Sequence, residues 1–244
     1  TDEQKARWLP GVVSGETVLG IAMTEPGAGS DLSGITTSAV RDGDHYVVNG
    51  SKTFISNGRN GDLFVVATRT SADKHKGLTL LVVDAAITGF ERGRNLDKIG
   101  LHAQDTSELS FHDMRVPVAN RLGEEGEGFY QLVRNLPQER LSLSVGAIAA
   151  AEGVFARTLE YVKERTAFGR PVFGFQNTKF KLAEVATEAR IARVFTDDCI
   201  MKHLDGKLDI PTAAMAKWWI TEELCKVADE CRQLFGGYGY MMEY

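Results

Sequence analysis

The pattern of apolar residues along the chain changes once, near residue 122, and this change constrains the fold more than any other feature of the sequence. Between residues 18 and 120, short runs rich in β-branched and aromatic residues alternate with turn signals, as in RDGDHYVVNG and GLTLLVVD. Such spacing is typical of a compact antiparallel β-domain, either a barrel or a sandwich. Strands that come first and helices that follow indicate an α+β protein rather than a sheet of βαβ units.

Beyond residue 122 the sequence predicts helices. Residues 144–169, 176–206 and 209–237 carry apolar side chains at three-to-four spacing, and Gly169, Gly206 and Gly236 are predicted to end these helices. Long helices with short connections are typical of an antiparallel bundle. We therefore predict a multidomain fold in which 1–17 is the tail of an N-terminal region or linker, 18–122 the β-domain and 123–244 an incomplete helical bundle.

Composition and missing motifs exclude several classes of function. The net charge of -5 argues against a surface for nucleic acid or anionic membrane. No apolar run approaches the roughly 18 residues of a membrane span, and no signal-peptide pattern opens the chain. The common nucleotide, zinc-protease and serine-hydrolase motifs are absent. Cys199, Cys225 and Cys231 form no CxxC pair and are interpreted as free buried thiols of a reducing compartment rather than as a metal site or a disulfide.

One glycine-rich segment, MTEPGAGSD at residues 23–31, is a candidate ligand loop. Pro26, Gly27 and Gly29 predict a tight loop whose backbone amides a ligand can approach closely. The hydroxyls of Thr24 and Ser30 flank it. Taken alone, the segment is either a turn between strands or a weak anion-binding site.

A second segment, NLPQERLSLSVGA at residues 135–147, places an acid and a base side by side in an otherwise small and apolar stretch. One interpretation is a helix start, with Asn135 as N-cap, Gln138 as its capping-box partner and Glu139 near the positive end of the helix dipole. The other interpretation is a catalytic carboxylate at Glu139 with Arg140 as its neighbour. The residues alone leave both open, and the two are compatible.

Four motifs in register resemble the acyl-CoA dehydrogenase family: MTEPGAGSD (23–31), FISNG (54–58), KERTAFGRPVFGFQ (163–176) and QLFGGYGYMMEY (233–244). Within the family, the segments NLPQERL (135–141), AMAKWW (214–219) and GGYGYMMEY (236–244) most resemble the long-chain branch and its bacterial relatives. The resemblance covers the family's middle β-domain and C-terminal helical domain; the N-terminal helical domain and the last helices are not in the sequence. It implies FAD as cofactor and desaturation of an acyl-CoA thioester to trans-2-enoyl-CoA. It also implies an electron-transferring flavoprotein as partner, a homo-oligomer, usually a dimer of dimers, and a bacterial cytoplasmic or mitochondrial matrix location, without nucleic acid or a membrane span.

The resemblance assigns cofactor contacts residue by residue. The loop from Ile21 to Ser30 lies against the flavin, with Thr24 at the pyrimidine edge and Ser30 near the pyrophosphate and the acyl-CoA. Phe54 stands where the family more often has tryptophan, which keeps the apolar cover of the ring but removes an N–H donor. A neighbouring subunit supplies contacts to the adenine half. The implied set is Ile21, Ala22, Met23, Thr24, Gly29, Ser30, Phe54, Ile55, Ser56, Arg165, Phe168, Gln176, Gln233, Gly236 and Gly237.

The resemblance also implies a role for Glu139. Desaturation needs a carboxylate that removes the α-proton of the thioester and needs no metal. In the long-chain and isovaleryl branches this base comes from the segment that matches LPQER, so Glu139 is the implied base; many relatives use a later glutamate instead. The implied substrate contacts are Ser30, Tyr130, Pro137, Gln138 and Arg140. Two alternatives stay open, an oxidase or monooxygenase of the same fold and a non-catalytic scaffold.

Overall fold

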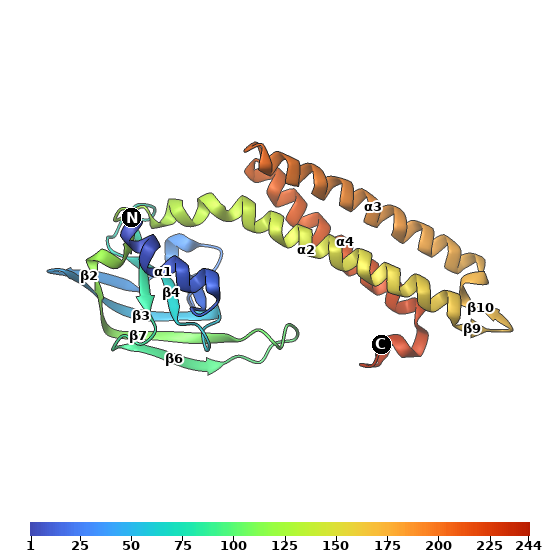
Figure 1. The fold of residues 1–244 in the computed structure, drawn as a ribbon, viewed down its shortest axis with the longest axis horizontal. Coiled ribbons are helices and arrows are strands. Elements are labelled where there is room, and N and C mark those ends of the chain that lie inside the picture. Colours follow the sequence, from blue (N-terminus) through green and yellow to red (C-terminus); the bar gives the residue numbers. More distant parts are fainter. The chain divides into compact units, whose positions relative to one another are not determined.

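A computed structural model describes residues 1–244, and these divide into two compact units, Thr1–Val133 and Arg134–Tyr244. The first holds the strands and the second the long helices, as the colours of Figure 1 show along the chain. The predicted α+β organisation, a sheet domain followed by helices, is confirmed.

The first unit contains one eight-stranded sheet in the order β6-β7-β3-β2-β4-β5-β8, with β1 paired to β4. Most neighbours are antiparallel, as predicted, but β1 and β2 each pair with β4 in parallel. The edge strands β6 and β8 do not pair with each other, so the sheet is not a closed barrel. Its elements are α1 (Asp2–Ser14), β1 (Leu19–Ala22), β2 (Ser38–Asp42), β3 (His45–Ser56), β4 (Leu63–Arg69), β5 (Leu78–Asp84), β6 (Phe90–Asn95), β7 (Thr106–Pro117) and β8 (Arg121–Leu122), with 3-10 turns at Leu32–Gly34 and Val118–Asn120.

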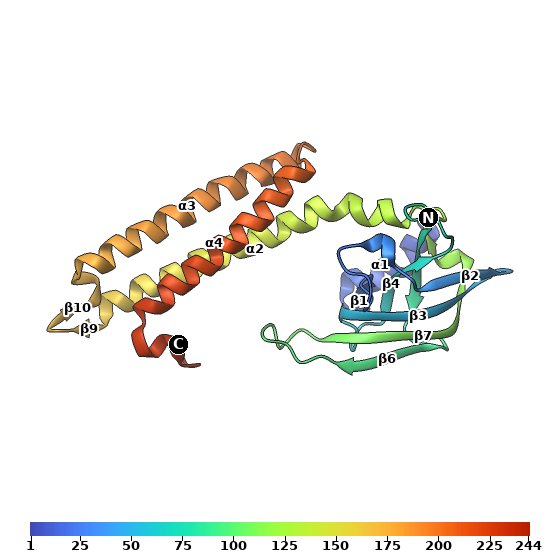
Figure 2. The same ribbon diagram turned by 180° about the vertical axis from the view of Figure 1, so that it is seen from behind.

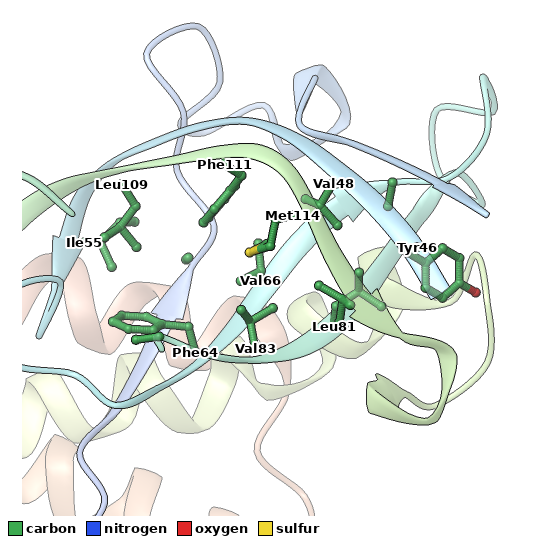
Figure 3. Packing of buried hydrophobic residues seen from close by; sticks show 14 residues of the cluster. Tyr46, Val48, Ile55, Phe64, Val66, Leu81, Val83, Leu109, Phe111 and Met114 are labelled. Carbon is green, nitrogen blue, oxygen red and sulfur yellow. The ribbon is translucent and has the colours of Figure 1, made fainter. Parts of the chain in front are cut away.

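Both faces of strand β5 are buried, which explains its unbroken apolar sequence. On one face Leu81 and Val83 join the main core with Phe64, Phe111 and other side chains of β3, β4 and β7 (Figure 3). On the other face Leu78 and Leu80 form a second cluster with Ala28, Ile35 and Leu132. Because a fully buried aliphatic side chain contributes about 1.5–3 kcal/mol, this second cluster holds the glycine-rich loop firmly against the sheet.

The second unit contains α2 (Gly128–Glu164) from Arg134 onward, α3 (Gln176–Leu204) and α4 (Ile210–Leu234). It also contains a small hairpin of β9 (Thr166–Ala167) and β10 (Arg170–Pro171) and 3-10 turns at Val172–Gly174 and Gly236–Tyr240. Figure 2 shows α3 and α4 joined by a tight turn. Small residues such as Ala151, Ala192 and Ala216 let the helices approach closely around Ile148 and Ile220. No helix is long and apolar enough to cross a membrane.

The predicted helix start at Asn135 is wrong. Helix α2 is continuous from Gly128 and passes through Asn135 and Pro137. The preceding turns are helical because Phe129 and Leu132 pack into the second cluster of the sheet domain. Pro137 lacks the N–H that would bond to the carbonyl of Val133. The first unit ends at Val133, where this helical hydrogen bond is missing.

Two smaller expectations also need correction. Gly206 and Gly236 have left-handed φ values of 68° and 61° just after α3 and α4, as predicted for helix ends. Gly169, however, lies in the β9–β10 hairpin, since α2 ends at Glu164. Cys199 and Cys231 are buried free thiols, and burial raises the pKa of each, whereas Cys225 is exposed.

Candidate functional site

The glycine-rich loop is fixed on one side by backbone hydrogen bonds. Glu25 and Ala28 exchange N–H···O bonds of 2.9 and 3.1 Å across a tight turn. The N–H of Thr53, on strand β3, donates to the carbonyl of Thr24 over 2.9 Å. Ala28 is 2% exposed and anchors the turn in the second cluster. The loop is therefore a rigid attachment to β3, and not a free surface turn.

The other side of the loop presents donors that have no partner in the protein. The backbone N–H groups of Thr24, Gly29 and Ser30 donate no hydrogen bond, and neither do the hydroxyls of Thr24 and Ser30. Because the Met23–Thr24 peptide is trans and planar, its N–H points opposite to the Met23 carbonyl, which is bonded inside the domain. These donors suit a ligand with several acceptor atoms along one edge.

A β-bulge in β3 supplies an aromatic surface beside this loop. Lys52 pairs with Leu109 and Ile55 with Ser107, so β3 has one residue more than β7 between these pairs. Phe54 lies in this bulge with its backbone in the left-handed region, at φ 59°, and its side chain is 67% exposed. A non-glycine residue held in this region is costly and is characteristic of functional sites.

The predicted flavin residues of this unit do not all face the same way. Ile21, Phe54 and Ser56 are exposed, Met23 and Thr24 are half-buried, and Gly29 and Ser30 are exposed. Ala22 and Ile55 point into the main core, where Figure 3 labels Ile55. The structure thus gathers the loop donors and Phe54 at the surface, with Ala22 and Ile55 beneath them.

A buried ion pair under the loop was not found from the sequence. The Nζ of Lys52 lies 2.9 Å from Glu25 Oε1 and 3.0 Å from the Met23 carbonyl, with the side chains 0% and 4% exposed for Lys52 and Glu25. Glu25 also accepts from both the N–H and the hydroxyl of Thr36 and from the N–H of Thr37. A lysine in a strand is usually solvated, but Lys52 continues the inward alternation of Tyr46 and Val48 and is buried against Glu25.

The pKa values of both groups in this pair are lowered from their ordinary values. Burial by itself would raise the pKa of the Glu25 carboxyl, but the hydrogen bond from Thr37 and the charge of Lys52 outweigh it and lower the pKa from 4.5 to about 2. Burial lowers the pKa of the Lys52 ammonium from 10.5 to about 8, against the opposing effect of Glu25. At neutral pH both groups are therefore charged.

The second unit has an open pocket of about 640 Å³ near the end of α4. Tyr161 and Phe235 stack in it with ring centroids 4.2 Å apart, and the Arg165 guanidinium lies 5.5 Å from the Tyr238 ring. Gly236 and Gly237 complete the lining. The pocket combines aromatic faces, a cation and accessible backbone, which suits an aromatic ligand that carries negative charge.

The remaining predicted cofactor residues of this unit do not line that pocket. Phe168 sits in the hairpin at φ 53°, between β9 and β10, and is 96% exposed. Gln176 begins α3 and Gln233 lies near the end of α4, both exposed. The structure thus brings Arg165, Gly236 and Gly237 together in the pocket. The other three predicted residues of this unit lie outside it.

Glu139 lies on α2 with an exposed side chain, and no ion pair joins it to Arg140. Successive helical residues do not face each other, so Arg140 does not neutralise the carboxylate. The helix begins at Gly128, which places Glu139 beyond the first turn where the dipole acts. Of the predicted substrate contacts, Tyr130 is 48% exposed, Gln138 is exposed, and Pro137 and Arg140 are half-buried.

Comparison with known proteins identifies these two units. The family model described as "Acyl-CoA dehydrogenase, middle domain" matches residues 20–114, and the model described as "Acyl-CoA dehydrogenase, C-terminal domain" matches residues 126–244. The chain belongs to the acyl-CoA dehydrogenase family. The glycine-rich loop, the β3 bulge and Phe54 all fall within the middle-domain match, and Glu139 and Arg165 within the C-terminal match.

Individual members of the acyl-CoA dehydrogenase family are similar along the whole chain. The mitochondrial long-chain specific acyl-CoA dehydrogenase of Mus musculus is 46% identical over 247 residues, which cover 100% of this chain and 57% of that protein. The crystal structure of an acyl-CoA dehydrogenase from Geobacillus kaustophilus is 56% identical, with a TM-score of 0.97 over 100% of this chain and 65% of that one. Butyryl-CoA dehydrogenase from Megasphaera elsdenii is 37% identical, with a TM-score of 0.95 over 100% of this chain and 64% of that one. The chain spans less than two thirds of the length of each.

Proposed function

We propose that the protein is an FAD-dependent acyl-CoA dehydrogenase that desaturates an acyl-CoA thioester to trans-2-enoyl-CoA and passes the electrons to an electron-transferring flavoprotein. The observation that carries this proposal is the outward row of unpartnered donors at Thr24, Gly29 and Ser30 beside the exposed ring of Phe54. The names of the relatives support the reaction class.

The residues present fit FAD. An isoalloxazine ring is flat and apolar on its faces, with acceptor atoms along its pyrimidine edge. Phe54 and Ile21 offer apolar cover for the ring, and the Thr24 N–H and hydroxyl offer donors for that edge. Gly29 and Ser30 offer N–H groups for a phosphate. In the second unit, Arg165 and the stacked aromatic rings offer what the adenine-dinucleotide half requires.

Glu139 is proposed to remove the α-proton of the substrate. When bound, FAD supplies the acceptor for the two electrons and for the hydrogen that leaves the β-carbon. The thioester carbonyl acidifies the α-carbon, and the carboxylate of Glu139, which forms no ion pair in the protein, is available to accept the proton. An acyl chain that excludes water from Glu139 favours its neutral, protonated form and so drives the transfer.

We propose roles for the other residues from the family resemblance and from the chemistry of their side chains. Tyr130 and Pro137 offer apolar surface to an acyl chain, while Ser30, Gln138 and Arg140 offer polar contacts to the thioester and the CoA. Arg165 and the exposed residues Phe168, Gln176 and Gln233, with Gly236 and Gly237, are proposed to meet the FAD of a neighbouring subunit. A ring that is 96% exposed, as Phe168 is, supports a contact of this kind. The active form is then a homo-oligomer, which we propose to be a dimer of dimers.

The test is an anaerobic titration of the FAD-loaded, full-length protein with acyl-CoA thioesters of graded chain length. We expect the visible flavin absorbance to bleach, trans-2-enoyl-CoA to form, and electron-transferring flavoprotein to reoxidise the enzyme faster than air does. Rapid reoxidation by air with product bound would establish an oxidase instead. Protein that takes up no FAD would refute the proposal and favour a scaffold.

A further inference from the structure

We propose that the buried Glu25–Lys52 ion pair is a positioning device for the flavin site, which sets the direction of the Thr24 N–H and the place of Phe54 together. The proposal rests on the function proposed above. Neither residue is exposed enough to touch a ligand, so any effect on a cofactor must pass through the loop and the strand that the two side chains join.

The pair is buried on both sides with a fully hydrogen-bonded carboxylate, and its burial separates it from the other ion pairs of the chain. Each carboxylate oxygen of Glu25 accepts two hydrogen bonds, Oε2 from the N–H and hydroxyl of Thr36, and Oε1 from the N–H of Thr37 and the Nζ of Lys52. In each of the other ion pairs at least one side chain is more than one third exposed. A buried pair held by these hydrogen bonds favours one relative arrangement, because separation of the two groups leaves buried charges unpaired.

The first consequence concerns the loop. Lys52 donates 3.0 Å to the Met23 carbonyl and so holds this carbonyl toward the inside. The planar trans peptide then directs the Thr24 N–H outward, toward the side where the flavin is proposed to bind. The Thr24 carbonyl is held in turn by the Thr53 N–H. Without Lys52, the Met23–Thr24 peptide loses the contact that determines which way it faces.

The second consequence concerns the aromatic cover. Lys52 continues the inward alternation of Tyr46 and Val48, and the bulge that directly follows it leaves Phe54 outward in the left-handed region. The attachment of Lys52 to Glu25, together with the bond from the Thr53 N–H to the Thr24 carbonyl, fixes the strand where it enters the bulge and so fixes where the Phe54 ring is presented. An apolar side chain at position 52 could fill the same space but could not donate to the Met23 carbonyl.

The test compares three variants with the wild-type full-length protein. Lys52→Met keeps the shape and removes the charge. The double variant Glu25→Gln/Lys52→Met leaves no buried unpaired charge but still lacks a donor to Met23. Tyr46→Phe is the matched control, since Tyr46 is buried on the same strand and its hydroxyl bonds Glu125 at 2.6 Å in another part of the domain. Each is measured for FAD dissociation constant, visible flavin spectrum and, without FAD, exchange of the backbone amides of Glu25, Ala28 and Thr53.

We expect Lys52→Met and the double variant to bind FAD about tenfold more weakly or worse, as the loss of a charge-assisted hydrogen bond implies, with an altered flavin spectrum. We also expect faster exchange of the Glu25, Ala28 and Thr53 amides, while Tyr46→Phe leaves all three readouts unchanged. A double variant that regains wild-type FAD affinity and exchange would overturn the proposal, because the pair would then be merely structural. If Lys52→Met does not fold, the double variant decides. If the wild type takes up no FAD, the proposed function fails, and the exchange rates alone decide whether the pair positions the loop.

Discussion

The replacement of Lys52 by methionine is expected to destabilise the sheet domain strongly. Methionine matches the lysine stem in length and fills the same space, so the change removes the ammonium group and little else. Glu25, whose side chain is 4% exposed, then stays charged with Thr36 and Thr37 as its only donors. Removal of one partner from a buried ion pair costs about 3–5 kcal/mol of unfolding free energy. Tyr46→Phe, which removes one hydrogen bond, is expected to cost about 1 kcal/mol.

The pH dependence of this loss follows from the carboxyl. The pKa of Glu25 is lowered from 4.5 to about 2 in the folded protein, so its contribution to stability is fully present above pH 4.5 and disappears as the pH falls toward 2. This difference in pKa corresponds to about 3 kcal/mol, close to the cost expected for Lys52→Met. In the variant the pKa of Glu25 rises, because burial remains and the charge of Lys52 is gone. The difference in stability between wild type and variant is therefore expected to shrink as the pH falls through this range.

The assay is urea unfolding followed by circular dichroism, without FAD, at about pH 7 and at several values down to about pH 3. We expect Lys52→Met to lose about 3 kcal/mol of unfolding free energy or more at neutral pH and clearly less at the acid end. A loss below about 1 kcal/mol at neutral pH, or one that does not change with pH, would refute the reasoning, since Glu25 and Lys52 would then not be coupled.

Three further predictions concern other parts of the chain. Phe54→Gly removes a side chain from a left-handed backbone position and should leave the unfolding free energy within about 1 kcal/mol of wild type. It should weaken FAD binding, measured by equilibrium dialysis. Unchanged affinity would show that Phe54 is not part of the site. Arg165→Ala should weaken FAD binding without change in Tm, whereas Arg190→Ala, also exposed, should do neither. Native protein should react rapidly with a thiol reagent at Cys225 alone, and Cys199 and Cys231 only after unfolding; rapid native labelling of either buried thiol would contradict their placement.

The order of strands and helices was predictable because hydrophobic periodicity is local. Runs such as LTLLVVD and the three-to-four spacing of 176–206 need no partner to be recognised. The parallel pairing of β1 and β2 with β4 was not predictable from such runs, since it depends on which strands meet in space. The division of the chain at residue 122 stays a prediction.

The failures of prediction share a physical cause, which is tertiary contact. Asn135 and Pro137 resemble a helix start, but the packing of Phe129 and Leu132 extends α2 backward past them. The burial of Lys52 depends on its contact with Glu25, a residue distant in the sequence, which no property of Lys52 itself reveals. The motifs pointed to the loop and to Phe54. They gave no role to the pair that anchors both, because Glu25 is a motif residue without an assigned contact and Lys52 lies just before FISNG.

The measurement that tests the central claim most directly is hydrogen exchange at the α-carbon of a bound acyl-CoA in D₂O, with anaerobic flavin bleaching recorded alongside. Glu139→Gln is compared with Glu160→Gln, a second exposed glutamate on the same helix. Both variants are expected to bind FAD and substrate, with α-exchange and bleaching lost by about 10²-fold or more only in Glu139→Gln. Wild-type rates in Glu139→Gln would show that another group accepts the proton.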